Sequence, residues 1–473
     1  MILLLSIQFN NKILKIRITA MINKLNTQEL ADEVDFFDGN LRVSKNGDVL
    51  TIYNKYNSNI CFYMEFIADH LYFSENFYEL PSFDINNINQ RILSKSLDGN
   101  IFGHDVFINN IYPLYHGYKL IKDKELIKIQ LIERNCFYTD PAECLLSVMD
   151  RISDEKNIAV SFSGGLDSTA ILYSVRNKYP NKNIIAFTWY NKGSSNNDLK
   201  YSEKICNDLS IELLKIDLDT GFLLNEFKKE NSTFSPFPFT YLTSLGFVKY
   251  YISELDKYFK KESFVILDGH GGDHLFFQSI PYELINYNFI AKIREYSNLY
   301  SINYYKIIKK IILHTLNPSR RLKIDNLRDQ NIFVALVESS VASVRLPSHI
   351  KFFFPFVTPE MIACSERFDI SETFNHSFTR LHFRESFKKK YNSDYFFRIN
   401  KGHMTGAYQR ELKRNYVFFS NLLRDGYLAH NKILNYELLT QKLKLASLGV
   451  GGFDVNLMNS IIFELIYKEL DGR

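Results

Sequence analysis

The chain has 473 residues and a mass of 55.5 kDa, which corresponds to roughly two or three domains of ordinary size. Its 46% hydrophobic and 23% charged residues are ordinary for a globular protein, and 15% aromatic residues exclude a largely disordered chain. Lys and Arg total 57 and Asp and Glu total 53, so the net charge of +4 does not indicate a nucleic-acid-binding protein.

Residues 1–143 are predicted to form a β-rich domain. Turn signals such as Asp38-Gly39-Asn40 separate the β-prone runs, and no long helical period occurs before about Pro141. The runs cover 2–9, 12–18, 48–54, 60–67, 70–78 and 125–132.

From residue 144 onwards, helical and strand patterns alternate. Helical periods cover 144–156, 167–178, 198–210 and 240–261, and apolar strand-like runs cover 157–163, 183–190, 211–218 and 263–269. This alternation predicts a doubly wound, parallel α/β sheet, followed beyond residue 280 by a mostly helical tail. We therefore expect two domains, 1–143 and 144–473.

Membrane spans and disulfides are not expected. No apolar run reaches the roughly 18–20 residues that cross a bilayer, and the opening MILLLSIQF lacks the features of a secretory signal. The five cysteines form no CxxC pair, which favours reduced thiols in a cytoplasmic protein and excludes a zinc ribbon. They are Cys61, Cys136, Cys144, Cys206 and Cys364.

The first motif, SFSGGLDS at 161–168, falls where a predicted buried strand ends and a helix begins. An open α/β sheet binds its ligand at such a position, and the glycines and first helical N–H groups suit an anion of pyrophosphate size. Asp167 would repel phosphate unless a cation lay between them, so Mg²⁺ is expected. No Lys follows the glycines, which excludes a Walker A loop. The expected nucleotide contacts are Phe162, Ser163, Gly164, Gly165, Asp167 and Ser168.

The second motif, DGHGGDHLF at 268–276, follows the fourth predicted strand and should open on the same sheet edge. Asp167 and Asp273 would then hold one Mg²⁺ that bridges the phosphates of ATP. Further nucleotide contacts are expected at Asp268, Gly269, Gly271 and Gly272. A structural Gly-rich turn is the alternative interpretation of the first motif.

The two motifs together resemble a known superfamily. SGGxDS resembles the PP-loop signature of ATP pyrophosphatases, and the G-H-G-G-D-H form is similar to lasso-peptide cyclases of the microcin J25 type. These are relatives of asparagine synthetase and β-lactam synthetase, which carry Glu where this chain has His270 and His274. The resemblance covers essentially the whole chain.

The two histidines could also suggest zinc. Gly271 and Gly272 make a helix there unlikely, so the required i, i+4 geometry is not expected. Local hydrogen bonds to the metal-binding Asp or to substrate are the favoured interpretation.

Downstream residues extend the resemblance. The superfamily's LRE…R-x-x-K pattern is resembled by Arg384-Glu385-Ser386 together with the run 397–402. This resemblance implies Lys401 as the catalytic cation and Arg398 as its helper. A solvated basic face is the alternative interpretation. Phe353–Phe356 resembles an x-x-P-F element, but Lys351 stands where relatives have Glu. A Tyr–Glu base pair is therefore not expected, and the base for the amine is not identified.

Two aromatic features near the predicted site have open roles. Trp189, at the end of the second strand, could border the adenine or belong to the core. The run 235–239 could contact substrate or form a rigid loop.

In asparagine synthetases the N-terminal domain is a glutaminase whose Cys follows the initiator Met. Here Ile2 follows Met1, and internal cysteines cannot supply a free α-amine. A degenerate glutaminase-like domain, retained for structure or partner docking, is therefore expected.

The resemblance implies an ATP-dependent, AMP-forming ligase that closes a macrolactam (isopeptide) ring in a ribosomally made peptide. It implies ATP and Mg²⁺ as cofactors, a precursor peptide as substrate, and a leader peptidase and a leader-recognition element as partners. The alternatives are a small-molecule amide ligase, which could be β-lactam synthetase-like or ammonia-dependent, a tRNA-modifying PP-loop enzyme and an inactive scaffold. The weak net charge and the absence of CxxC pairs weigh against the tRNA enzyme.

Overall fold

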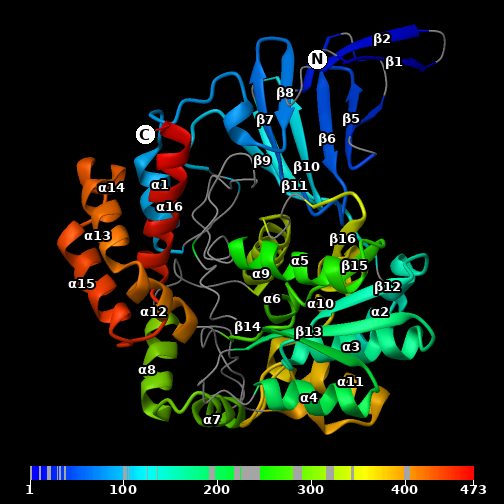
Figure 1. The fold of residues 1–473 in the computed structure, drawn as a ribbon, viewed down its shortest axis with the longest axis vertical. Coiled ribbons are helices and arrows are strands. Elements are labelled where there is room, and N and C mark those ends of the chain that lie inside the picture. The colour runs from blue at the N-terminus through cyan, green and yellow to red at the C-terminus, as the bar shows by residue number, and fades with distance from the viewer. Residues whose placement is uncertain are drawn as a thin grey trace.

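The structure is a computed structural model. It describes residues 3–472 except positions 10–11, 19–22, 29, 31–32, 37–38, 100–103, 105, 125, 136, 191–197, 218–223, 225–244, 281–289, 316–323, 342–345 and 399–404. A β-rich N-terminal region lies above an α/β region in Figure 1, and the C-terminal helices lie along one side of both.

A five-stranded parallel sheet forms the centre of the α/β region, as the alternating pattern predicted. Its order is β14-β13-β12-β15-β16, so the chain reverses direction across the sheet between β12 and β15. Every residue of β12 and β15 is buried, which explains their continuous apolar sequences. The strands are β12 (Asn157–Ser161), β13 (Asn183–Tyr190), β14 (Glu212–Asp217), β15 (Phe264–Leu267) and β16 (Ile350–Phe353).

Helices cover this sheet and begin at recognisable caps. The helix expected from residue 144 begins at Pro141, because the Asp140 side chain accepts hydrogen bonds from the N–H groups of Ala142 and Glu143. The first helices are α2 (Pro141–Val148), η2 (Met149–Ile152), α3 (Leu166–Lys178), α4 (Asp198–Asp208), α5 (Leu245–Tyr258) and α6 (Gly272–Leu275). They are followed by α7 (Ile290–Leu299), α8 (Tyr304–Thr315), α9 (Ile324–Val341), η7 (Pro355–Val357), α10 (Pro359–Ser365), η8 (Ile370–Glu372), α11 (Leu381–Tyr391) and η9 (Asp394–Phe397).

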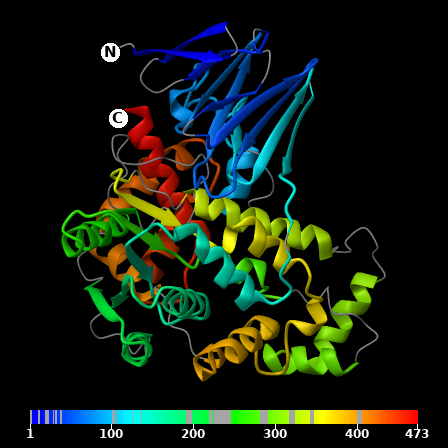
Figure 2. The same cartoon turned by 90° about the vertical axis from the view of Figure 1, so that its right-hand side faces the viewer.

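The N-terminal region consists mainly of antiparallel sheets, in agreement with the β-rich prediction. One has the order β11-β10-β6-β5-β4, another the order β3-β8-β7-β9, and β1 and β2 form a separate hairpin (Figure 2). The strands are β1 (Leu3–Phe9), β2 (Lys12–Ile18), β3 (Asn23–Asn26), β4 (Val34–Phe36), β5 (Leu41–Asn46), β6 (Val49–Asn54), β7 (Phe62–Ile67), β8 (His70–Ser74), β9 (Tyr112–Leu114), β10 (Tyr118–Asp123) and β11 (Leu126–Leu131). The turn η1 (Phe77–Glu79) and the helix α1 (Gln90–Leu97), neither of which was predicted, interrupt them.

The C-terminal part is helical, as predicted. Its last helix, α16, packs against α1, so the C-terminal end returns to the N-terminal region (Figure 1). The helices are α12 (Thr405–Arg414), α13 (Tyr416–Asp425), α14 (Tyr427–His430), α15 (Tyr436–Ser447) and α16 (Val455–Asp471).

The N-terminal and α/β regions share one hydrophobic core, which runs from Leu25 to Leu470. Two buried hydrogen bonds also join the regions. Asn59 donates to the carbonyl of Phe352 in β16 (3.0 Å), and Nε2 of His116 lies 2.7 Å from the Ser339 hydroxyl in α9. The N-terminal region is therefore in direct contact with elements that border the sheet. No helix among the described residues has the length and apolarity that crossing a bilayer requires.

Candidate active site

The two glycine motifs lie at neighbouring strand ends, as predicted. β12 and β15 pair in parallel, with Val160 opposite Leu267, so the loops that follow them leave the same sheet edge. This edge also contains the reversal of strand order, where open α/β sheets bind their ligands.

The first loop has the geometry of an anion-binding turn. Gly164 has φ +66°, and a side chain there would crowd the Ser202 hydroxyl at 3.0 Å. Gly165 precedes α3, whose first N–H groups have no partner within the helix. The Ser168 hydroxyl donates to the Gly165 carbonyl (3.2 Å) and lies 3.4 Å from the Ser163 hydroxyl. The loop therefore brings backbone donors and two hydroxyls to the start of a 13-residue helix.

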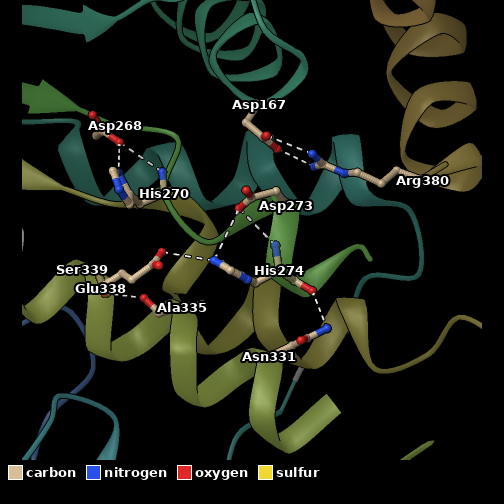
Figure 3. Close-up of polar contacts among 10 residues, drawn as sticks. All are labelled: Asp167, Asp268, His270, Asp273, His274, Asn331, Ala335, Glu338, Ser339 and Arg380. Carbon is tan, nitrogen blue, oxygen red and sulfur yellow. Dashed lines mark hydrogen bonds and ion pairs between the residues drawn. The ribbon is translucent and has the colours of Figure 1, made fainter. Parts of the chain in front are cut away.

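Asp167, in the first turn of α3, is bound by a buried arginine that the sequence analysis did not identify. The Arg380 guanidinium contacts both carboxylate oxygens: Nη1 donates to Oδ2 at 2.9 Å, and Nη2 donates to Oδ1 (Figure 3). Arg380 is 2% exposed, and its guanidinium also lies 4.6 Å from the ring of Phe383. This arrangement fixes the orientation of the Asp167 carboxylate.

The second loop begins with a partly buried ion pair between Asp268 and His270. The His270 Nδ1 lies 2.6 Å from Asp268 Oδ1, which also accepts from the His270 N–H. Burial opposes ionisation of Asp268, but the charge and hydrogen bonds of His270, with a bond from Ser161, hold the pKa of Asp268 below its usual range. For His270, burial is outweighed chiefly by Asp268, which raises its pKa to about 9. His270 is therefore protonated at neutral pH.

The rest of the second loop differs from one detail of the prediction. A helix at Gly271-Gly272 was not expected, yet α6 begins at Gly272, because Gly271 takes a left-handed φ of +89° that lets the chain turn into it. His270 lies before this helix and His274 lies inside it, so the two are not paired across a helical turn. His274 bonds Glu338 of α9 instead, with Nε2 3.1 Å from Oε2.

Asp167 and Asp273 come from loops that touch. A methyl group on Gly272 would overlap Asp167 Oδ1 and lie 2.8 Å from its Cγ, so the Asp167 carboxylate rests directly on the residue before Asp273. That both carboxylates bind one Mg²⁺ stays a prediction. In Figure 3 the Asp167 carboxylate points to Arg380 and that of Asp273 is turned towards His274, whose N–H it accepts at 3.1 Å.

The donor chemistry of this pair nevertheless fits Mg²⁺. The described residues contain no group of three or more His, Cys, Asp or Glu arranged around a metal position. Mg²⁺ characteristically binds through one or two carboxylates, with phosphate oxygens and waters completing the octahedron. The Asp273 side chain, 45% exposed, is open to such a ligand.

Arg398 also belongs to the site, where it supports the first loop. Its guanidinium donates to the Gly164 carbonyl (2.9 Å), pairs with Asp198 and lies 4.1 Å from the ring of Tyr201. Arg384 donates instead to the carbonyls of Thr379 and Phe396, which fixes the segment that carries both other arginines.

The remaining predicted residues have varied surroundings. The Phe162 side chain is fully buried in the core, so only its backbone can reach a nucleotide. Trp189 is partly buried against Phe247, with ring centroids 5.6 Å apart. Lys351 pairs with Glu155 (2.7 Å) on the surface. Lys401 and the run 235–239 lie outside the described residues.

Sequence reasoning missed Arg380 and Glu338. Arg380 is one of several basic residues between 380 and 398, and nothing in that pattern marks it as buried. Glu338 is a single acidic residue in an otherwise mostly apolar stretch of a long helix, which was the one weak signal available.

Two sequence comparisons relate the chain to known proteins. Residues 145–337 match the family model described as asparagine synthase. The Microcin J25-processing protein McjC of Escherichia coli is 23% identical over 335 residues, which cover 67% of this chain and 62% of that protein. The match thus spans less than two thirds of the relative.

Two solved structures are also similar in part. An NH3-dependent NAD synthetase from Campylobacter jejuni, in complex with nitrate, matches 44% of this chain and 96% of its own, with 15% identity and a TM-score of 0.24. The U34-tRNA thiolase NcsA from Methanococcus maripaludis, with its [4Fe-4S] cluster, matches 57% and 86%, with 13% identity and a TM-score of 0.23.

Proposed function

Because residues 145–337 match the asparagine synthase family model, we propose that this chain is an ATP-dependent, AMP-forming ligase that closes a macrolactam ring in a peptide. A side-chain carboxylate of the peptide attacks the α-phosphorus of ATP, and the bond to the leaving pyrophosphate breaks. The peptide's N-terminal amine then attacks the acyl carbon of the adenylate, AMP leaves, and the amine proton passes to a base or to solvent. The products are an isopeptide bond, AMP and pyrophosphate.

One observation carries the proposal: two glycine loops, each with an Asp, leave adjacent parallel strands at the point where the strand order reverses. A loop with free backbone donors at the start of α3 suits the phosphates of a nucleotide. The two carboxylates beside it suit the metal that accompanies such phosphates. A structural turn would need neither.

In this proposal the nucleotide contacts come from both glycine loops and from the end of β13. They are Phe162, Ser163, Gly164, Gly165, Asp167, Ser168, Trp189, Asp268, Gly269, Gly271 and Gly272. Asp167 and Asp273 hold Mg²⁺, which supplies charge neutralisation at the phosphates. Arg398 holds the Gly164 carbonyl and so keeps the first loop open towards the nucleotide. Lys401, three residues further along the chain, is proposed to neutralise charge that builds up on the phosphates during adenylation.

The proposal of a peptide substrate is supported by the relative whose printed description is microcin J25 processing. A precursor peptide, a leader peptidase and a leader-recognition protein or domain are the proposed partners. The N-terminal region is proposed to have lost glutaminase activity and to support α9, which it contacts through His116 and Ser339. Four described cysteines are buried and outside any disulfide, which is compatible with the proposed cytoplasmic location.

Substrate-dependent pyrophosphate release tests the proposal. The chain is assayed with ATP and Mg²⁺ plus either linear peptides with an Asp or Glu near the N-terminus, or aspartate with ammonia. Release that depends on peptide, with loss of one water from the peptide mass, supports the cyclase. Release with aspartate and ammonia alone supports the small-molecule amide ligase, and release with neither supports an inactive scaffold.

Asp273→Asn provides the matched control for this assay. It removes one proposed metal ligand from a partly exposed side chain, so the fold should persist while pyrophosphate release is lost. Wild-type release by this variant would remove Asp273 from the site.

A further inference from the structure

The pairing of Arg380 with Asp167 bears on how a metal ion could bind. Arg380 directly precedes α11 and adopts a left-handed backbone conformation with φ +59°, where it is almost completely buried. Phe383 and Phe276 flank its guanidinium at 4.6 and 6.0 Å. A side chain enclosed in this way cannot easily swing aside when a ligand arrives.

The pair leaves part of the Asp167 carboxylate available. An ionised carboxylate has about four lone-pair sites, and a bidentate arginine occupies one on each oxygen. One site per oxygen therefore remains, and the guanidinium fixes the direction in which those sites point. Metal binding and the Arg380 pair are thus geometrically compatible.

The charges around Asp167 oppose a bare cation, however. Arg380 neutralises the charge of Asp167. Arg384 is also near: burial is the main cause of the lowered pKa of Arg384, and the positive charge of Arg380 contributes to it. The positive charges of Arg380 and Arg384 thus offset much of the negative charge of Asp167 and Asp273, and neither guanidinium loses its proton under ordinary conditions. A divalent ion meets repulsion here, whereas a triphosphate is attracted.

We infer that Arg380 is a positioning residue that makes this site bind a divalent metal only together with a triphosphate, because it neutralises Asp167 while fixing its orientation. The inference rests on the proposed function and adds an order of binding to it. Free metal binds weakly, and the metal–nucleotide complex binds because its phosphates supply the missing negative charge.

Direct binding measurements test this. The affinity of the full chain for free Mn²⁺ is measured by electron paramagnetic resonance, and its affinity for Mn²⁺·α,β-methylene-ATP by calorimetry. Arg380→Gln should bind free Mn²⁺ at least about tenfold more tightly and the complex at least about tenfold more weakly than wild type. Arg380→Lys, which keeps the charge, should stay within about threefold of wild type for free Mn²⁺.

A control and a wild-type arm make the outcome decisive. Arg134→Gln removes another largely buried guanidinium, whose carboxylate partner is Glu366 and which has no place in the proposed site, so free Mn²⁺ affinity should not change. Weaker or unchanged binding of both ligands by a folded Arg380→Gln would overturn the inference, because a merely structural arginine gives that result. If that variant does not fold, wild type decides: free Mn²⁺ bound as tightly as the complex overturns the inference, and weak free Mn²⁺ supports it. A wild type that binds no nucleotide at all overturns the proposed function itself.

Discussion

The close contact between Gly272 and Asp167 gives a quantitative test of the site's geometry. Gly272 has no left-handed φ, so Gly272→Ala is a substitution that the backbone permits. The new methyl group would overlap Asp167 Oδ1 and lie 3.2 Å from Phe356 Cδ2. Asp167 cannot retreat without breaking its bonds to Arg380.

The cost follows from these contacts. Because Asp167 must retreat from the methyl group, the substitution breaks its ion pair with the buried Arg380, and breaking a buried pair costs about 3–5 kcal/mol. Removing a helical glycine returns up to about 1 kcal/mol. We therefore expect Gly272→Ala to lower the free energy of unfolding by roughly 2–4 kcal/mol.

Urea denaturation measures this through the fluorescence of Trp189, which is the only tryptophan and lies in β13 of the same region. The matched control is Gly452→Ala, because a methyl group there meets nothing within 4 Å. In an Asp167→Ala background the clash is absent, so adding Gly272→Ala should cost almost nothing more. Equal stability of Gly272→Ala and Gly452→Ala, or strictly additive costs in the double variant, would refute the described packing.

Three further predictions concern the site and the N-terminal region. His270 has a raised pKa of about 9 in the folded chain, so its stabilising contribution is complete below about pH 6.5 and is lost as the pH rises through 9. Urea denaturation between pH 6 and 10 should show a decline, of about 3 kcal/mol at most, that is reduced in His270→Gln. Lys401→Ala should slow pyrophosphate release roughly 100-fold with less effect on the nucleotide dissociation constant, and an equal loss in both would contradict its proposed role. Cys61→Ala and Cys144→Ala should leave peptide-dependent pyrophosphate release within about twofold of wild type. Both thiols are buried away from solvent and play no part in the proposed chemistry. A large loss of release in the Cys61 variant would point to an active N-terminal region.

Four of the five strands of the α/β sheet were predictable because each is a short, mostly apolar run next to a helical period. β13 agrees with its predicted range at both ends. β16 was missed because Lys351 interrupts its four residues and Pro355 follows closely, so the segment shows no continuous apolar run. α1 was missed for a similar reason, since its eight residues follow a series of turns.

The positions of the two glycine motifs were also predictable, because strand ends in a parallel sheet share one edge. The partners of their charged groups were not. Asp167 and Arg380 are 213 residues apart, and His274 and Glu338 are 64 apart, so only the folded chain brings them together. Glycine turns and strand ends are local features, whereas ion pairs between distant elements depend on tertiary packing.

The most direct test of the central claim follows the oxygen atoms during ligation. A linear peptide substrate is labelled with ¹⁸O in the acceptor side-chain carboxylate and incubated with the chain, ATP and Mg²⁺. If that carboxylate is adenylated, one labelled oxygen must appear in AMP, and mass spectrometry should find it there. Ring closure with ADP as the product, or with the label in inorganic phosphate, would contradict an AMP-forming ligase.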